Sequence, residues 1–284
     1  MSTTADVCIT EFTDPGCPWA WSAEPFRLRL SWLYGDGIEW RPRMVVLAED
    51  PQEYLDKGFT PDKLRAGLTT IAREHGMPID TSLRPRMAAT APACRAIVAT
   101  RLHVRASERA ILRALRRRCM AGELLDEAAT VRHAAADAGL DPDAVLAWSA
   151  EPATELAMRG DMAAAREPIA AARVLDERLA NWSGGRRYTC PSYEIVRRSD
   201  GVRIAVPGFQ PFAAYDVVLA NLVPGTERRE APESVLEVLA WAGAPLATRE
   251  VAVVCDIDHA TAREELGRVA DEAHVGADGF WSPR

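Results

Sequence analysis

The chain has 284 residues, of which 48% are hydrophobic and 26% are charged, a balance typical of a globular protein with one large domain or two smaller ones. Its formal net charge of −7 argues against nucleic acid as the main partner. The first residues are polar and no apolar run reaches transmembrane length, so we expect neither a signal peptide nor a membrane contact. The six cysteines form no closely spaced pairs, which predicts free thiols in a reducing cytoplasm.

A single cysteine lies near the N-terminus between a predicted strand and a predicted helix. The strand is DVCITEFT at 6–13, the cysteine segment is DPGCPWAW at 14–21, and an apolar segment of helical length follows and ends near Gly35. Pro18 takes the first helical position, where a missing N–H costs nothing. A helix N-terminus stabilises a thiolate. This placement predicts a reactive sulfur at Cys17, against the alternative of a buried structural cysteine in a turn.

The order of strand, Cys-Pro-aromatic motif and helix resembles the DsbA-like branch of the thioredoxin superfamily. Its intracellular members read Asp-Pro-x-Cys-Pro-Trp-Cys-Trp, whereas Ala20 stands here in the place of the second, resolving cysteine. The resemblance implies an α/β thioredoxin fold with a helical insertion and thiol chemistry at Cys17. It also makes Pro18, Trp19, Ala20 and Trp21 candidate substrate contacts, although aromatic residues at such positions more often serve packing.

The middle of the chain predicts how this fold is divided. Residues 37–47 are typical of a second strand, parallel to the first by way of a helical crossover. From residue 50 to about 180 the sequence is rich in Ala, Leu and Arg and is interrupted by Gly and Pro, which predicts four to six helices. We therefore expect a thioredoxin fold in two parts, 1–49 and 181–225, around a helical insertion at 50–180.

A run of arginines within this insertion has two open interpretations. Between residues 95 and 118, eight arginines face a single acid, Glu108. The run could form an anion site for a phosphate or for a thiol cofactor that carries carboxylates. Alternatively it is a solvated helix face paired with nearby acids such as Glu123, Asp126 and Glu127, which is the usual role of a charge run. The arginines are Arg95, Arg101, Arg105, Arg109, Arg113, Arg116, Arg117 and Arg118.

A hairpin is expected near residue 200, where an Asp-Gly pair joins two strand-like runs at 189–196 and 202–206. An apolar helix at 212–222 follows. In DsbA-like proteins an x-Pro-Ser/Thr-aromatic segment opens this hairpin and its proline is cis. Pro191 matches that proline, so the resemblance implies that Thr189 and Pro191 contact substrate.

The residue before that proline approaches the active sulfur in thioredoxin folds, and here it is Cys190. The resemblance therefore implies that Cys190 lies near Cys17 and makes it a candidate catalytic residue. Three outcomes stay open, namely a disulfide between the two, a shared metal ion, or a thiol that only packs. The five histidines show no metal spacing with each other or with the cysteines, so we expect no metal site.

Two acids precede the cysteine. Glu11 lies where DsbA-like proteins often carry an acid beneath the active sulfur, and it could accept the thiol proton or be a buried carboxylate with a structural partner. We expect Asp14 to cap the turn or the first helix.

Residues 226–284 are predicted to form a separate unit. Helices are expected at 234–242, 245–252 and 259–273, followed by a turn and a short apolar segment at 278–281. This order resembles a small winged helix. Acidic residues outnumber basic ones two to one in the unit, so we expect it to serve packing or protein contact instead of DNA binding.

These patterns predict a cytoplasmic DsbA-like thiol–disulfide oxidoreductase that works as a monothiol through Cys17. An external thiol or another cysteine would resolve the mixed disulfide. One alternative is a low-molecular-weight-thiol-dependent isomerase or transferase of the same superfamily, although such relatives usually carry serine at this position. Another is a non-catalytic interaction protein. The expected partner is a thiol or disulfide substrate, with no nucleic acid and no membrane; a homodimer stays open. No permanently bound cofactor is expected, with a low-molecular-weight thiol as the one candidate.

Overall fold

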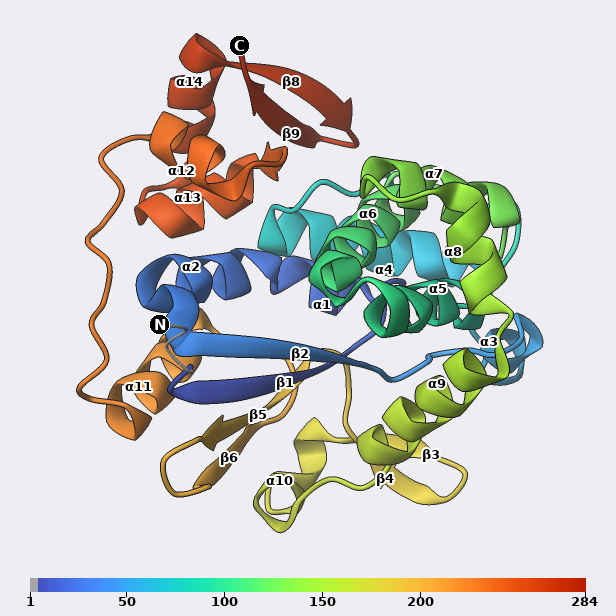
Figure 1. The fold of residues 1–284 in the computed structure, drawn as a ribbon. Helices are drawn as coiled ribbons and strands as arrows, with labels where there is room; N and C mark the ends of the chain where they lie inside the picture. The colour runs from blue at the N-terminus through green and yellow to red at the C-terminus, as the bar shows by residue number, and fades with distance from the viewer. Residues whose placement is uncertain (1–4) are drawn as a thin grey trace.

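The computed structural model describes residues 5–284 and centres on a four-stranded sheet (Figure 1). Its strand order is β2-β1-β5-β6, with β1 at Val7–Thr13, β2 at Ile38–Met44, β5 at Ser192–Arg197 and β6 at Arg203–Val206. β1 is apolar and β-branched and is buried along almost its whole length, as a central strand should be. It runs parallel to β2 and antiparallel to β5, which confirms the predicted crossover and the predicted hairpin.

The crossover from β1 to β2 contains two helices instead of the single one that the sequence predicts. They are α1 at Pro18–Ser22 and α2 at Glu24–Tyr34. The break falls just before Pro25, which lacks an N–H and cannot continue the hydrogen-bond ladder of a preceding helix. α2 packs against one face of the sheet together with α11 at Phe212–Leu222, whose bounds agree with the predicted apolar helix.

The insertion between β2 and β5 holds eight α-helices in the part of the chain that the structure describes, more than the four to six predicted. Two of them, of five and four residues, are too short to give a periodic pattern in the sequence. α5 to α8 gather into one bundle with an apolar core (Figure 1). The helices are α3 Gln52–Asp56, α4 Pro61–His75, α5 Ala91–His103, α6 Glu108–Met120, α7 Ala128–Asp137, α8 Pro142–Ser149, α9 Pro152–Ala165 and α10 Ala170–Arg173.

A two-stranded sheet follows the insertion. It pairs β3 at Ala180–Trp182 with β4 at Gly185–Arg187, and three-residue strands of this kind leave no recognisable alternation in the sequence. None of the helices in residues 5–284 is both long enough and apolar enough to cross a membrane.

The C-terminal unit contains three helices and a three-stranded sheet of order β7-β9-β8. Its third helix ends at Val269, and residues that were expected to continue the helix form β8, because they pair with β9 as a hairpin. The second helix begins at Thr248, later than predicted. The elements are α12 Val235–Ala242, β7 Leu246–Ala247, α13 Thr248–Cys255, α14 His259–Val269, β8 Ala270–Val275 and β9 Asp278–Pro283. The winged-helix interpretation stays a prediction.

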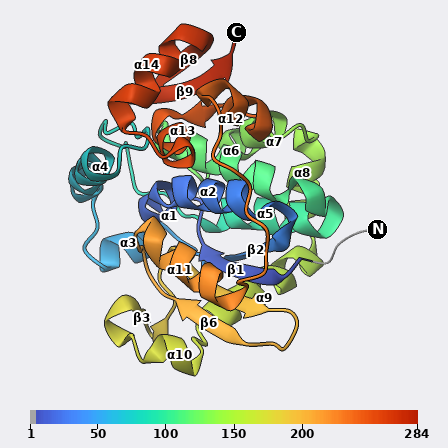
Figure 2. The ribbon, with the colours of Figure 1, turned by 90° about the vertical axis from the view of Figure 1, so that its left-hand side faces the viewer.

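This unit lies directly on α2, as the turned view shows (Figure 2). Leu28 and Trp32 of α2 belong to the same buried apolar cluster as Val238, Leu239 and Val251. The unit therefore shares its core with the helix that follows the cysteine motif.

Candidate active site

Cys17 lies at the junction that the sequence predicts. β1 ends at Thr13, a turn follows in which the Cys17 N–H donates to the Asp14 carbonyl at 3.2 Å, and Pro18 is the first residue of α1. Cys17 is the N-cap of α1 with an extended backbone, and its own carbonyl accepts from the Trp21 N–H at 3.0 Å. The local sequence thus fixes the sulfur beside the free N–H groups of the first helical turn.

Asp14 holds this turn in place, as expected from the sequence. Its Oδ1 accepts from the Gly16 N–H at 2.7 Å, while its Oδ2 accepts from the Leu47 N–H and the Thr90 hydroxyl, both at 2.8 Å. Gly16 is required here because a Cβ would approach the Thr90 methyl to 2.8 Å. Burial raises the pKa of Asp14, against the effect of these hydrogen bonds.

The loop before β5 contacts the sulfur of Cys17. The Cys190–Pro191 peptide bond is cis, as predicted. The Cys17 thiol donates to the Cys190 carbonyl oxygen at 3.3 Å. Hydrogen bonding with the Cys190 side chain lowers the pKa of Cys17, and the N–H groups of Ala20 and Trp19 lower it further, while burial works against them. The result is a thiol that ionises more easily than an ordinary cysteine.

Cys17 and Cys190 open into a cavity of about 450 Å³, which we call the thiol groove. A third cysteine, Cys119, lines the same groove. The remaining walls are mainly apolar and come from the region of α3 and α4, the loop before α5 and the loop after α6; they include Tyr54, Phe59, Leu64, Leu68, Met87 and Leu124. Sequence reasoning missed these walls, because no spacing in the chain links α3 and α4 to the cysteine motif.

The candidate contact residues divide between the groove and the interior. Pro18, Trp19 and Thr189 line the groove, and Trp19 is 39% exposed. Ala20 is buried in the apolar cluster around Cys17, and Pro191 is buried as well.

Trp21 does not line the groove. It is fully buried, its indole N–H donates to the Pro78 carbonyl at 3.0 Å, and its ring centroid lies 6.0 Å from that of Phe280 in the C-terminal unit. Trp21 therefore joins the motif helix to that unit.

Basic side chains outnumber acidic ones around the groove. Lys57, Arg84 and Arg86 have carboxylate partners, and Glu123 is the acid on the lining. Lys63 donates to the Gly58 carbonyl at 2.7 Å and Arg187 donates to the Tyr188 carbonyl at 2.7 Å. Neither of these two cations has a carboxylate partner among residues 5–284. Within the same range no group of three or more His, Cys, Asp or Glu side chains is arranged to hold a metal ion.

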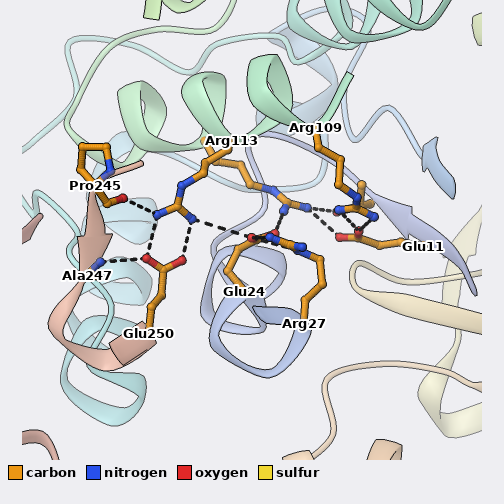
Figure 3. Close-up of polar contacts among 10 residues, drawn as sticks. Glu11, Glu24, Arg27, Arg109, Arg113, Pro245, Ala247 and Glu250 are labelled. Atoms are coloured by element: carbon orange, nitrogen blue, oxygen red, sulfur yellow. Dashed lines mark hydrogen bonds and ion pairs between the residues drawn. The ribbon is translucent and has the colours of Figure 1, made fainter. Parts of the chain in front are cut away.

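Glu11 lies in an interior of ion pairs (Figure 3). Its Oε2 accepts from both terminal nitrogens of Arg109 at 3.1 Å, and its Oε1 accepts from Arg116 at 3.0 Å. Burial opposes ionisation of Glu11, but the guanidinium groups of Arg116 and Arg109 outweigh it and hold the pKa of Glu11 below its ordinary value. An ionised carboxylate held by two cations supports the structural alternative for Glu11 over the role of proton acceptor.

Both interpretations of the arginine run are wrong for the centre of α6. Arg116 is 1% exposed and contacts Glu24 as well as Glu11. Arg113 pairs with Glu250 of the C-terminal unit at 2.6 Å and lies 3.9 Å from Glu24 (Figure 3). We call this set the buried ion-pair network; it consists of Glu11, Glu24, Arg27, Arg109, Arg113, Arg116 and Glu250. It is neither an open anion site nor a solvated face.

The acids that lie near the arginine run in the sequence supply few of its ion-pair partners. Glu123 does pair with Arg118 at 2.7 Å, but Asp126 and Glu127 both contact Arg86, which lies outside the run.

Known proteins share the fold of this chain. A structure of a probable DsbA oxidoreductase from Streptomyces coelicolor matches with a TM-score of 0.55 and 18% identity, over 79% of this chain and 93% of the other. The cytosolic disulfide reductase DsbM from Pseudomonas aeruginosa matches with a TM-score of 0.52 and 20% identity, over 76% and 99%. Its structure with GSH matches with a TM-score of 0.50 and 20% identity, over 75% and 98%.

At the level of sequence, no curated protein matches the chain. A family model described as DSBA-like thioredoxin domain matches residues 8–168, more than half of the chain. The protein belongs to the family of DSBA-like thioredoxin domains.

Proposed function

We propose that this protein is a thiol–disulfide oxidoreductase that acts through Cys17. The observation that carries the proposal is the placement of the Cys17 sulfur, at the start of α1, in an open groove and 3.3 Å from the carbonyl oxygen that precedes the cis-proline. The lowered pKa of Cys17 supports it, because the thiolate is the nucleophile in exchange reactions.

The reaction begins when the Cys17 thiolate attacks one sulfur of a substrate disulfide. The new bond joins Cys17 to that sulfur, the substrate disulfide breaks, and the other half leaves as a thiolate that takes up a proton. Since Ala20 replaces the usual second cysteine, the thiol that resolves this mixed disulfide has to come from outside the motif.

The groove supports a small thiol or disulfide that carries carboxylates. Its walls are mainly apolar, and Lys63 and Arg187 offer cations without a carboxylate partner. The same two cations favour the second candidate function, a low-molecular-weight-thiol-dependent isomerase or transferase. The related DsbM has been solved with GSH, a ligand of this chemical class. We place the reaction in a reducing compartment, in keeping with six free cysteines.

A coupled reductase assay tests the proposal, with 2-hydroxyethyl disulfide as the substrate and glutathione as the reductant. We expect turnover by the natural protein and a loss of at least about 100-fold in Cys17→Ser. Cys255→Ser is the control, because Cys255 is half-buried and burial raises its pKa to about 11. A protein without turnover that still binds glutathione would indicate the isomerase or transferase. Without turnover, binding or a Cys17 adduct, the interaction protein is the remaining candidate.

The cations are tested by replacing glutathione with 2-mercaptoethanol, which has no carboxylate. We expect Lys63→Gln to raise the KM for glutathione several-fold and to leave the KM for 2-mercaptoethanol unchanged. Lys57→Gln is the matched control on the same groove, since Lys57 already pairs with Glu53. Equal effects of both variants would show that Lys63 does not contact the reductant.

A further inference from the structure

Strand pairing explains why two cysteines separated by 173 residues meet at the groove. β1 and β5 run antiparallel with Phe12 opposite Ser192, so the chain that leaves β1 toward Cys17 and the chain that enters β5 from Cys190 lie at the same end of the sheet. Both cysteines belong to one buried cluster and both line the thiol groove. The position of the Cys17 sulfur next to the main chain of Cys190 is therefore a property of the fold.

The two sulfurs differ in how easily they ionise. Burial raises the pKa of Cys190, and the hydrogen bond and charge of the adjacent Cys17 sulfur raise it further, while the Arg187 guanidinium lowers it. Once Cys17 is part of a mixed disulfide, its sulfur carries no charge, and both of its contributions to the pKa of Cys190 are removed. The environment thus makes Cys17 the first nucleophile, and formation of the mixed disulfide removes the two effects of Cys17 that raise the pKa of Cys190, while the effect of burial stays.

We propose that Cys190 is the resolving thiol of this protein and that the cis-proline loop replaces the missing second cysteine of the motif. The inference rests on the proposed function of Cys17. It assigns Cys190 a role that the motif itself cannot fill, because Ala20 has no sulfur and is 1% exposed.

The second step is an exchange within the protein. Cys190 loses its proton and attacks the Sγ atom of Cys17, the bond between Cys17 and the substrate sulfur breaks, and a Cys17–Cys190 disulfide forms. The departing substrate thiolate takes up the proton. Over both steps the substrate disulfide gains two electrons and two protons, and the two cysteines are oxidised. Two molecules of a low-molecular-weight thiol then return the cysteines to the dithiol and leave as a disulfide.

Cys119 is the rival on the same groove and therefore the matched control. Burial raises the pKa of Cys119 to about 12 and also raises the pKa of Cys190, so ease of ionisation does not separate the two thiols. Cys190 differs from Cys119 in its place in the fold, because its main-chain carbonyl oxygen lies 3.3 Å from the Cys17 sulfur and it shares the buried cluster of Cys17, to which Cys119 does not belong.

The test uses the fully reduced full-length protein and one equivalent of 5,5′-dithiobis(2-nitrobenzoic acid), without oxygen. Attack by Cys17 releases one thionitrobenzoate and leaves the other on the protein. If Cys190 resolves the adduct, a second thionitrobenzoate is released and peptide mapping finds a Cys17–Cys190 disulfide. We expect this result for the natural protein and for Cys119→Ser. We expect a single release and a stable adduct on Cys17 in Cys190→Ala.

Each other result has a definite meaning. A stable Cys17 adduct in the natural protein overturns the role of Cys190 and leaves the reactivity of Cys17 intact. Loss of the second release in Cys119→Ser, with a Cys17–Cys119 disulfide in the natural protein, assigns the step to Cys119 instead. Absence of any adduct or disulfide at Cys17 overturns the proposed function, and the inference with it. If Cys190→Ala does not fold, Cys190→Ser and peptide mapping of the natural protein decide the question.

Discussion

The thiol groove and the buried ion-pair network both depend on β1, yet their polar groups are satisfied to different degrees. In the network, the carboxylates of Glu11 and Glu24 each face more than one guanidinium group. At the groove, the Cys17 sulfur has one hydrogen-bond partner among residues 5–284, the main-chain carbonyl of Cys190, and lines an open cavity. Removing one partner of a buried ion pair destabilises a fold, whereas a nucleophile with a perturbed pKa at a cavity is a candidate for reaction.

The difference shows why residue type alone misleads. The run of eight arginines suggested an anion site, but its central arginines form ion pairs with buried glutamates of the same protein. The chemistry that we propose depends instead on a single cysteine followed by proline. Burial and hydrogen-bond partners decide between the two roles.

The largest effect is expected from Arg116→Ala. The change leaves Glu11 and Glu24 buried with fewer cations, and breaking a buried ion pair costs about 3–5 kcal/mol of the free energy of unfolding. Urea unfolding measures it. The control is Arg105→Ala, because Arg105 is exposed and its pair with Glu39 should contribute less than about 1 kcal/mol. Equal costs for the two variants would mean that the network does not stabilise the fold, and Glu11 would again be a candidate base.

A smaller and more local effect is expected from Glu250→Gln. Glu250 accepts from Arg113 and from the Ala247 N–H, so the neutral amide weakens the link between α6 and the C-terminal unit. We expect the free energy of unfolding to fall by about 1–3 kcal/mol and hydrogen exchange in α13 to become faster. Disulfide reductase turnover should stay unchanged. Glu237→Gln, in an exposed pair with Arg229, is the control. A fall in turnover that matches the fall in stability would show that the groove depends on this link.

Acid should destabilise the protein through the network. The pKa values of Glu11 and Glu24 are lower in the folded state than the ordinary value of about 4.3, so the folded state binds fewer protons. The stability that the two ionised carboxylates add to the folded state is present above about pH 4.3 and is lost as the pH falls below that value. Urea unfolding at pH 7, 5 and 3 measures the loss. Glu11→Gln should flatten the curve, whereas Asp14, whose pKa is raised by burial, acts in the opposite direction in both proteins. Equal slopes in the two proteins would contradict the prediction.

Local patterns in the sequence predicted the parts of the site that are local. The strand before Cys17, the helix start at Pro18, the hairpin at 200–201 and the cis-proline at 191 were all predicted correctly. Each depends on a few neighbouring residues or on a motif position. The break before Pro25 was not predicted, although a proline disrupts a helix that precedes it.

The rest depends on contacts between distant parts of the chain. Acids at positions 11, 24 and 250 supply the partners of α6, and nothing in their spacing relates them to the arginines. The groove walls come from α3 and α4, which the sequence shows only as helices or not at all. Such contacts are set by tertiary packing and cannot be derived from periodicity.

The smallest effect concerns the pKa of Cys17. It distinguishes the contribution of the Cys190 side chain from that of the N–H groups of α1. The rate of alkylation by iodoacetamide follows the thiolate fraction, so its pH midpoint for Cys17 should lie below the ordinary thiol value of about 8.5. Hydrogen bonding with the Cys190 side chain is the largest cause of this shift. Cys190→Ala removes that donor and should raise the midpoint, whereas the hydroxyl of Cys190→Ser can still donate and should raise it less. Mass spectrometry of the Cys17 peptide gives the rates, with Cys119→Ser as the variant that leaves the midpoint in place. Identical midpoints for all three variants and the natural protein would assign the activation of Cys17 to the N–H groups of α1 alone, and the cysteine pair would then matter for resolution but not for attack.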